Sequence, residues 1–132
     1  MKIIACIEDQ NGILFNRRRL SSDAVLTARL LDHIGDATLW VTPYSAKLFE
    51  GTSVRVDPCF MEKAEDEDYC FIEDTDISSY MDKISQIRLY RWNRRYPSDC
   101  KFPELGDAWR LISTEEFEGN SHPVITEEVY ER

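Results

Sequence analysis

Arginine and aromatic side chains alternate along one stretch of the sequence. Arg88, Arg91, Arg94 and Arg95 interleave there with Tyr90, Trp92 and Tyr96. Such a segment can bind single-stranded nucleic acid, because guanidinium groups attract phosphate while aromatic rings stack on bases. The chain as a whole carries a formal net charge of -9, which repels nucleic acid. We therefore favour a structural strand with one buried and one basic face, and keep a protein- or RNA-binding module that uses Arg88–Arg95 as an alternative.

Carboxylates gather at a second place, where Glu73, Asp74 and Asp76 follow a short apolar run. Clustered carboxylates can bind a divalent cation through their oxygens. Acidic residues are also what a helix dipole favours at the start of a helix, and this interpretation requires no ion. We therefore predict no metal site.

Cysteine and histidine do not form a metal-binding or nucleophilic pattern. Cys6, Cys59, Cys70 and Cys100 lie far apart, with no Cys-x-x-Cys pair, which predicts reduced, buried or half-buried thiols. His33 and His122 have no serine or cysteine nucleophile pattern beside them. Both histidines are therefore predicted to be structural or surface residues.

The composition favours one folded domain over residues 1–132. Hydrophobic residues make up 42% and charged residues 31% of the sequence, which supports a buried core and argues against disorder. The opening apolar run ends at Glu8 and Asp9 and is too short for a signal peptide. No apolar run approaches the roughly 20 residues that span a bilayer. We expect a cytoplasmic protein that binds neither DNA nor membranes.

The elements that must position these residues alternate between strand and helix. The run Lys2–Ile7 predicts a buried strand, and Ser21–Asp23 offers an N-cap for a helix over 24–34 that ends at Gly35. Further strands are predicted at 37–42, 53–56, 69–72 and 87–92, with helical segments at 44–49 and 76–84 and a helical or irregular segment at 61–68. Two late strands, 109–113 and 124–130, enclose an acidic loop. This order predicts an α/β sandwich with a mostly parallel sheet and an antiparallel C-terminal hairpin.

Short motifs follow one another in a fixed order from end to end of the chain. They are Ile3–Cys6, Asp9–Ile13, Leu20–Asp23, Ile84–Tyr90, Asp99–Pro103, Trp109 and Glu128–Arg132. This series resembles the dihydrofolate reductase family, which begins with an apolar strand and Asp-x-Asn-Gly and later carries Asp-Thr-x-Phe-Pro and a closing Phe-Glu-x-Tyr-Glu-Arg type of strand. The resemblance implies a dihydrofolate reductase-like three-layer sandwich with a shortened middle region, mainly between Phe49 and Tyr69.

The resemblance places Asp23 at the position of the family's lone carboxylate, which helps to deliver a proton to the substrate while NADPH supplies hydride. An apolar pocket raises the pKa of a carboxyl group and suits it to this work. Asp23 could instead cap helix 24–34, and we favour that interpretation because capping requires no other residue. The resemblance also implies that Cys6, Arg18, Thr27 and Tyr90 line the same groove, with Arg18 in place of a tryptophan and Tyr90 in place of a threonine.

The positions that bind the cofactor in this family carry unsuitable residues. Pyrophosphate needs glycines that let main-chain N–H groups approach it, and Glu73–Thr75 stand there instead. The family's Gly-Arg-x-Thr, whose arginine binds phosphate, is replaced by Thr42–Ser45. We therefore expect no cofactor, no NADPH-dependent reductase activity, and a groove repurposed for a small ligand or a partner protein. The alternative is a minimal NADPH-dependent folate or pterin reductase with Asp23 as proton donor.

Overall fold

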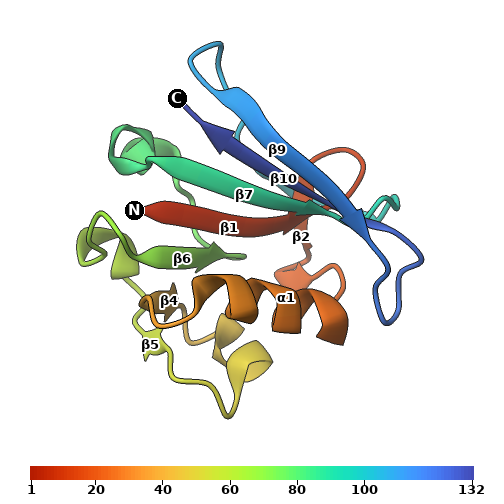
Figure 1. Cartoon of the computed structure of the whole chain (residues 1–132), viewed down its shortest axis with the longest axis horizontal. Coiled ribbons are helices and arrows are strands. Elements are labelled where there is room, and N and C mark those ends of the chain that lie inside the picture. The colour runs from red at the N-terminus through yellow and green to blue at the C-terminus, as the bar shows by residue number, and fades with distance from the viewer.

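The computed structural model describes residues 1–132, and a seven-stranded sheet forms its centre (Figure 1). The strands are β1 (Lys2–Ile7), β4 (Leu39–Val41), β5 (Arg55–Val56), β6 (Tyr69–Ile72), β7 (Gln86–Arg91), β9 (Arg110–Phe117) and β10 (Ile125–Glu131). Their order is β5-β4-β6-β1-β7-β10-β9. Neighbours from β5 to β7 run parallel, and β10 is antiparallel to both β7 and β9. The predicted α/β architecture with a C-terminal hairpin is confirmed.

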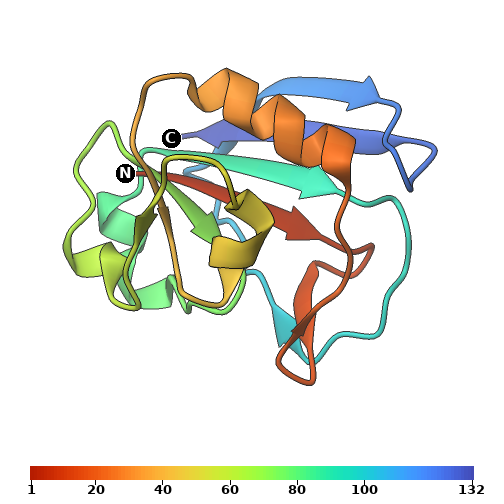
Figure 2. The same ribbon diagram turned by 90° about the horizontal axis from the view of Figure 1, so that it is seen from below.

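One face of the sheet is covered by the only α-helix, α1 (Ala24–Ile34) (Figure 2). Leu26, Leu30 and Ile34 recur at helical spacing and are buried against the sheet. Gly35 ends the helix with a φ of 58°, a left-handed conformation that glycine adopts without strain. The 3-10 helix η1 (Ser45–Phe49) lies on the same side, where Phe49 packs on Phe71.

The opposite face is covered without any α-helix. The 3-10 helices η2 (Phe60–Glu62) and η3 (Ser78–Lys83) lie there, and Phe60, Ile77 and Phe102 pack against the sheet. The helical segments predicted at 44–49, 61–68 and 76–84 are therefore short 3-10 turns. None of the three has a side-chain cap at its first residue, and segments of this length do not repay the cost of starting an α-helix.

A small second sheet was missing from the sequence prediction. It consists of β2 (Gly12–Phe15), β3 (Arg18–Arg19) and β8 (Cys100–Lys101), in the order β3-β2-β8. The two-residue turn Asn16–Arg17 joins β2 to β3, and both residues have positive φ, 52° and 61°. This is the twist that short hairpins require. The turn lacks the usual Asn-Gly or Asp-Gly, so no local motif predicted it.

The C-terminal hairpin is longer than predicted, because β9 continues through the acidic residues 114–117 that were expected to form a loop. Glu115 lies opposite Glu127 on β10, and two like charges in this position repel. Arg29 of α1 forms ion pairs with both carboxylates. The strand therefore tolerates its charge because a helix across the sheet neutralises it.

The four cysteines are free, but only Cys6 and Cys70 are buried or half-buried as predicted, and Cys59 and Cys100 are exposed. Burial raises the pKa of Cys70 to about 12 and also raises that of Cys6. Both thiols therefore stay protonated and poorly reactive. No helix of the structure is both long and apolar enough to cross a membrane.

Gly12, at the start of β2, has no room for a side chain. A Cβ atom there would overlap the side chain of Ser98 and lie 2.7 Å from Oε2 of Glu8. We predict that Gly12→Ala lowers the free energy of unfolding by about 1–3 kcal/mol, as overpacking does elsewhere, measured by urea denaturation. Gly106→Ala is the matched control because an added Cβ there meets nothing within 4 Å. Equal stability of the two variants would contradict the crowding argument.

Candidate functional site

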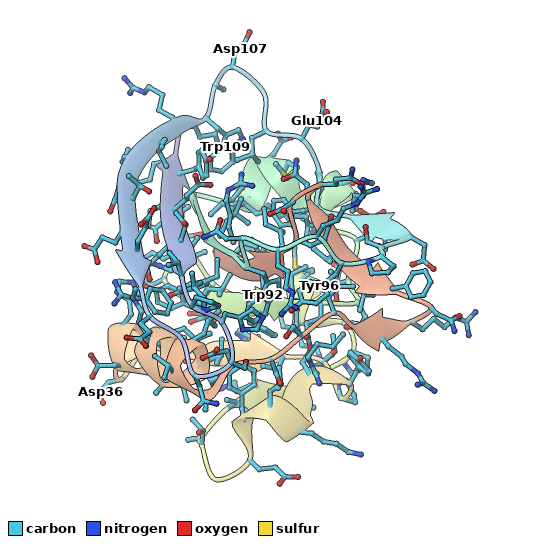
Figure 3. The ribbon with its side chains drawn as sticks, turned by 90° about the vertical axis from the view of Figure 1, so that its right-hand side faces the viewer. Asp36, Trp92, Tyr96, Glu104, Asp107 and Trp109 are labelled. Atoms are coloured by element: carbon cyan, nitrogen blue, oxygen red, sulfur yellow. The ribbon has the colours of Figure 1, made fainter.

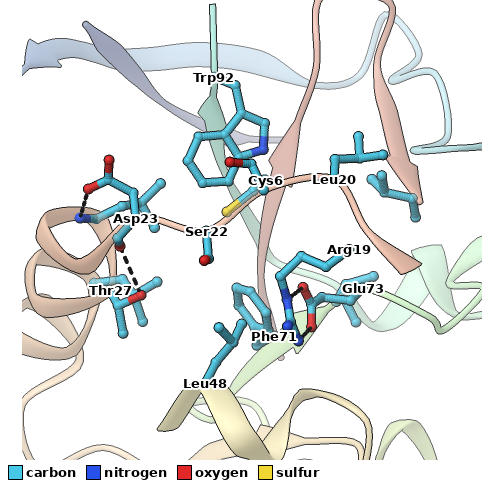
Figure 4. A pocket seen from close by; sticks show the side chains of 15 residues that line it. Cys6, Arg19, Leu20, Ser22, Asp23, Thr27, Leu48, Phe71, Glu73 and Trp92 are labelled. Atoms are coloured by element: carbon cyan, nitrogen blue, oxygen red, sulfur yellow. Dashed lines mark hydrogen bonds and ion pairs between the residues drawn. The ribbon is translucent and has the colours of Figure 1, made fainter. Parts of the chain in front are cut away.

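A small cavity lies between the start of α1 and the carboxyl ends of β1 and β6 (Figure 4). Apolar side chains such as Leu26, Phe71 and Trp92 form much of its wall. The volume of the cavity that is open to water is about 20 Å³. A single water molecule needs a volume of about 10–15 Å³ of this kind. Side chains therefore close the groove expected beside Asp23 down to the size of one water molecule.

Asp23 is the N-cap of α1, and its carboxylate is fully engaged. It accepts hydrogen bonds from the main-chain N–H groups of Val25 (3.0 Å), Leu26 (3.3 Å), Asn120 (2.9 Å) and Ser121 (2.8 Å), and its Oδ2 lies 3.1 Å from Nδ1 of His122. Burial alone would raise the pKa of Asp23, but these hydrogen bonds outweigh burial and hold the pKa well below its ordinary value. The capping interpretation is confirmed, and Asp23 is a fixed anion.

His122 lies at the centre of a second set of contacts and is only 3% exposed. Its Nε2 lies 3.2 Å from Oγ of Ser21 and 2.9 Å from the hydroxyl of Tyr96. The ring of Trp92 stacks on the imidazole at 4.4 Å between centroids, and Figure 3 labels Trp92 and Tyr96, the two aromatic residues that contact His122. Burial fits the structural role predicted for His122, whereas its contact with Ser21 was not predicted. No local pattern in the sequence could have shown this, because about a hundred residues separate His122 from Ser21.

A second polar network closes the far side of the cavity, opposite Asp23 (Figure 4). Glu73, just after β6, accepts two hydrogen bonds from Arg19, at 2.6 and 2.8 Å, and one from Ser45 at 2.7 Å. Beside it, Thr42 donates a 2.8 Å hydrogen bond to Asp74. The segments that follow β4 and β6 are thus joined to each other by their own side chains.

The predicted ligand-binding residues are only partly brought together. Cys6 and Thr27 line the cavity with Asp23. Arg18 does not, because it points from the β2–β3 hairpin into solvent, and its neighbour Arg19 lines the cavity instead. Tyr90 is fully buried and makes an edge contact with Phe117, away from the cavity.

The segment Arg88–Arg95 does not form one exposed basic surface. β7 lies between β1 and β10, so its side chains alternate between two covered faces. Arg88 is buried, with ion pairing to Glu127 at 3.1 Å and a 2.8 Å contact to His33, while Arg91 pairs with Glu128. Tyr90 and Trp92 are buried as well. The strand is held by acidic partners on β10, and no three metal-ligating side chains converge near it or elsewhere.

An open groove of about 310 Å³ lies beside the β2–β3 hairpin, and we call it the basic groove. Its lining includes Phe15, Arg18, Leu20 and Tyr96. The guanidinium of Arg94 lies 5.7 Å from the centre of the Tyr96 ring, close enough for a cation–π contact. Arg18 and Arg94 are exposed and form no ion pair, unlike Arg19, Arg29, Arg88 and Arg91.

Comparison with known proteins identifies the fold. Dihydrofolate reductase from Enterococcus faecalis, complexed with NADP(H) and RAB-propyl, aligns with a TM-score of 0.69 over 99% of this chain and 95% of that chain. The two sequences are 12% identical. No family model and no curated protein matches the sequence. The chain therefore has the dihydrofolate reductase-like fold that its motifs predict.

Asp23 should make folding stability depend on pH in the acid range. Its pKa is lowered in the folded protein, so its stabilisation is complete above the unfolded pKa of about 3.9 and declines as the pH falls below it. We predict that Asp23→Asn lowers the free energy of unfolding at pH 7 by about 1.5–3 kcal/mol. The variant should also lose less stability than the wild type between about pH 5 and pH 2.

Urea denaturation across this pH range measures both effects. Asp32→Asn is the control, because Asp32 is an exposed carboxylate on the same helix. An Asp23→Asn curve that matches the Asp32→Asn curve would show that the cap contributes little.

Proposed function

We propose that this protein has the dihydrofolate reductase fold without NADPH-dependent reductase activity, and that it binds an acidic segment of a partner protein in the basic groove. The observation that carries the first part is the pair of carboxylates, Glu73 and Asp74, directly after β6. Open α/β sheets bind dinucleotides at the carboxyl ends of their strands, where N–H groups face the phosphates. Carboxylates at that position repel phosphate, so the residues present do not fit a dinucleotide.

Arg19 lies beside these carboxylates, but its charge is not available to bind phosphate. Both guanidinium nitrogens that Arg19 presents there are bound to Glu73, and Ser45 donates to the same carboxylate. A phosphate would have to break this buried ion pair, and breaking such a pair by removing one partner costs about 3–5 kcal/mol. The network therefore favours a protein that does not use the cofactor.

The cavity beside Asp23 also counts against reductase activity. Pockets for ligands of drug size hold about 300–1,000 Å³, whereas the cavity beside Asp23 has room for about 20 Å³. A proton donor must also carry a proton at the working pH, and the lowered pKa of Asp23 keeps its carboxyl group ionised. Both features count against the alternative of a minimal folate or pterin reductase.

The basic groove is the best candidate for partner binding. It is open, and Phe15 in its lining is 47% exposed. Arg18 in the lining and Arg94, whose guanidinium lies over the Tyr96 ring, are exposed and form no ion pair. The carboxylate of Asp99 at the same hairpin accepts a hydrogen bond from the N–H of Asn16. Arg17 adds a third exposed guanidinium at the hairpin turn. A short acidic segment matches this local charge, whereas a long nucleic acid would extend over the rest of a surface whose net charge is -9.

Calorimetry with NADPH tests the loss of cofactor binding. We predict no saturable binding at NADPH concentrations up to about 1 mM. A dissociation constant of about 1 mM corresponds to a binding free energy of only about 4 kcal/mol. A dissociation constant in the micromolar range would overturn this part of the proposal. Dihydrofolate-dependent oxidation of NADPH that is abolished by Asp23→Asn would establish the reductase alternative instead.

Fluorescence anisotropy with a labelled hexaglutamate peptide tests the groove. We predict that the double variant Arg18→Glu and Arg94→Glu weakens binding at low salt by about tenfold or more, equivalent to about 1.4 kcal/mol. The double variant Arg55→Glu and Arg110→Glu is the control, because it makes the same charge change at two exposed arginines on the edge strands β5 and β9. Equal weakening by the control would contradict the assignment, and tighter binding of a single-stranded oligouridine than of hexaglutamate would favour RNA.

A further inference from the structure

A hydroxyl, an imidazole and a carboxylate stand in line just before α1. Oγ of Ser21 lies 3.2 Å from Nε2 of His122, and Nδ1 of the same ring lies 3.1 Å from Oδ2 of Asp23. These are the contacts of an activated serine, in which a base touches the nucleophile and a third group orients the base. Neither the fold nor partner binding at the basic groove requires this alignment, so the inference does not rest on the proposed function.

The imidazole is held in the orientation that a general base needs. Nδ1 lies 3.1 Å from Oδ2 of Asp23 and 3.0 Å from Oγ of Ser121, and the Ser121 hydroxyl donates to the same Oδ2. Both neighbours of Nδ1 can therefore accept its hydrogen, which leaves the lone pair of Nε2 toward the Ser21 hydroxyl. Trp92 stacks on the ring at an interplanar angle of 27° and prevents it from turning. We propose that Ser21 is a nucleophile toward small acyl esters, with His122 as its general base and Asp23 as the residue that positions the imidazole.

The surroundings limit the substrate to a small acyl group with a larger anionic alcohol. Ser21 is half-buried at the wall of the cavity, whose room of about 20 Å³ excludes long acyl chains. Arg19 and Leu20 line both this cavity and the basic groove, so the two spaces lie on either side of them. Arg18 in the groove is placed to attract a negative charge on the alcohol portion. The main-chain N–H of Ser21 donates no hydrogen bond within the chain and is free to stabilise an oxyanion.

The reaction balances without any further reactant except water. The Ser21 hydroxyl gives its proton to Nε2 of His122 while its oxygen bonds to the ester carbonyl carbon. The carbon–oxygen bond to the alcohol then breaks, and the alcohol takes the proton from His122. Water attacks the acyl-serine in the same way, which releases the carboxylic acid and restores Ser21.

Tyr96 makes the proposal distinguishable from a purely structural network. Its hydroxyl lies 2.9 Å from Nε2 of His122 and competes with Ser21 for the single lone pair there. Tyr96→Phe removes this competitor, so it should speed acylation of Ser21 if the serine is activated. In a network with only a structural role, the same change has no effect on reactivity.

The test measures release of nitrophenolate from p-nitrophenyl acetate together with mapping of the acetylated residue by peptide mass spectrometry. We expect acetylation of Ser21, at least about a tenfold loss of release in Ser21→Ala and His122→Gln, and a faster rate in Tyr96→Phe. Asp23→Asn should slow the reaction as well, because an amide at Oδ2 favours the wrong imidazole tautomer. Ser53→Ala is the control, since Ser53 is an exposed serine that does not line the cavity.

Circular dichroism confirms that each variant is folded before its rate is compared. Acetylation confined to lysines, or release that is unchanged in Ser21→Ala, would overturn the proposal. A rate in Tyr96→Phe equal to or below that of the wild type would overturn the assignment of His122 as the base. None of these results affects binding of NADPH or of hexaglutamate, so failure here and failure of the proposed function are separate outcomes.

Discussion

The carboxylate of Asp23 joins two parts of the chain that the site depends on. It caps α1 through Val25 and Leu26 and anchors the loop after β9 through Asn120 and Ser121. Hydrogen bonds to a buried charge are each stronger than neutral ones, and leaving such a charge unpaired is costly. The loop must therefore approach closely, and Gly119 allows this because a Cβ there would lie 2.6 Å from Asp23. The same contacts bring His122 to Ser21.

The hydrogen bonds to Asp23 also limit the chemistry that its carboxylate can perform. A carboxylate with every oxygen occupied is a structural anion and a means of orienting an imidazole, but a poor source of protons. Across the cavity, the Arg19–Glu73 pair occupies the carboxyl ends of the parallel strands, which is where open α/β sheets in general bind ligands. The backbone architecture is retained while side chains fill the space between its elements, which illustrates that a fold does not fix a function.

Paired and unpaired arginines lie in different parts of the molecule. Arginines that lie over the sheet are paired with glutamates on β10, as Arg88 is with Glu127 and Arg91 with Glu128. Arg18 on β3, which lines the basic groove, and Arg94, which lies over Tyr96 of the same lining, have no such partner. A protein with an excess of acidic residues therefore carries unpaired positive charge beside this groove, and this contrast supports the proposal of an acidic partner.

The sequence by itself determined the main sheet, α1 and the capping role of Asp23, because strand and helix periodicity and N-cap chemistry are local properties of the chain. It also indicated the fold through motifs spread from Ile3 to Arg132. Only the tertiary structure decided that the cavity is closed, that Arg19 rather than Arg18 faces it, and that Tyr90 and Trp92 are buried. It alone placed His122 against Ser21, because contacts between residues about a hundred positions apart depend on strand order and loop path, which no local pattern encodes.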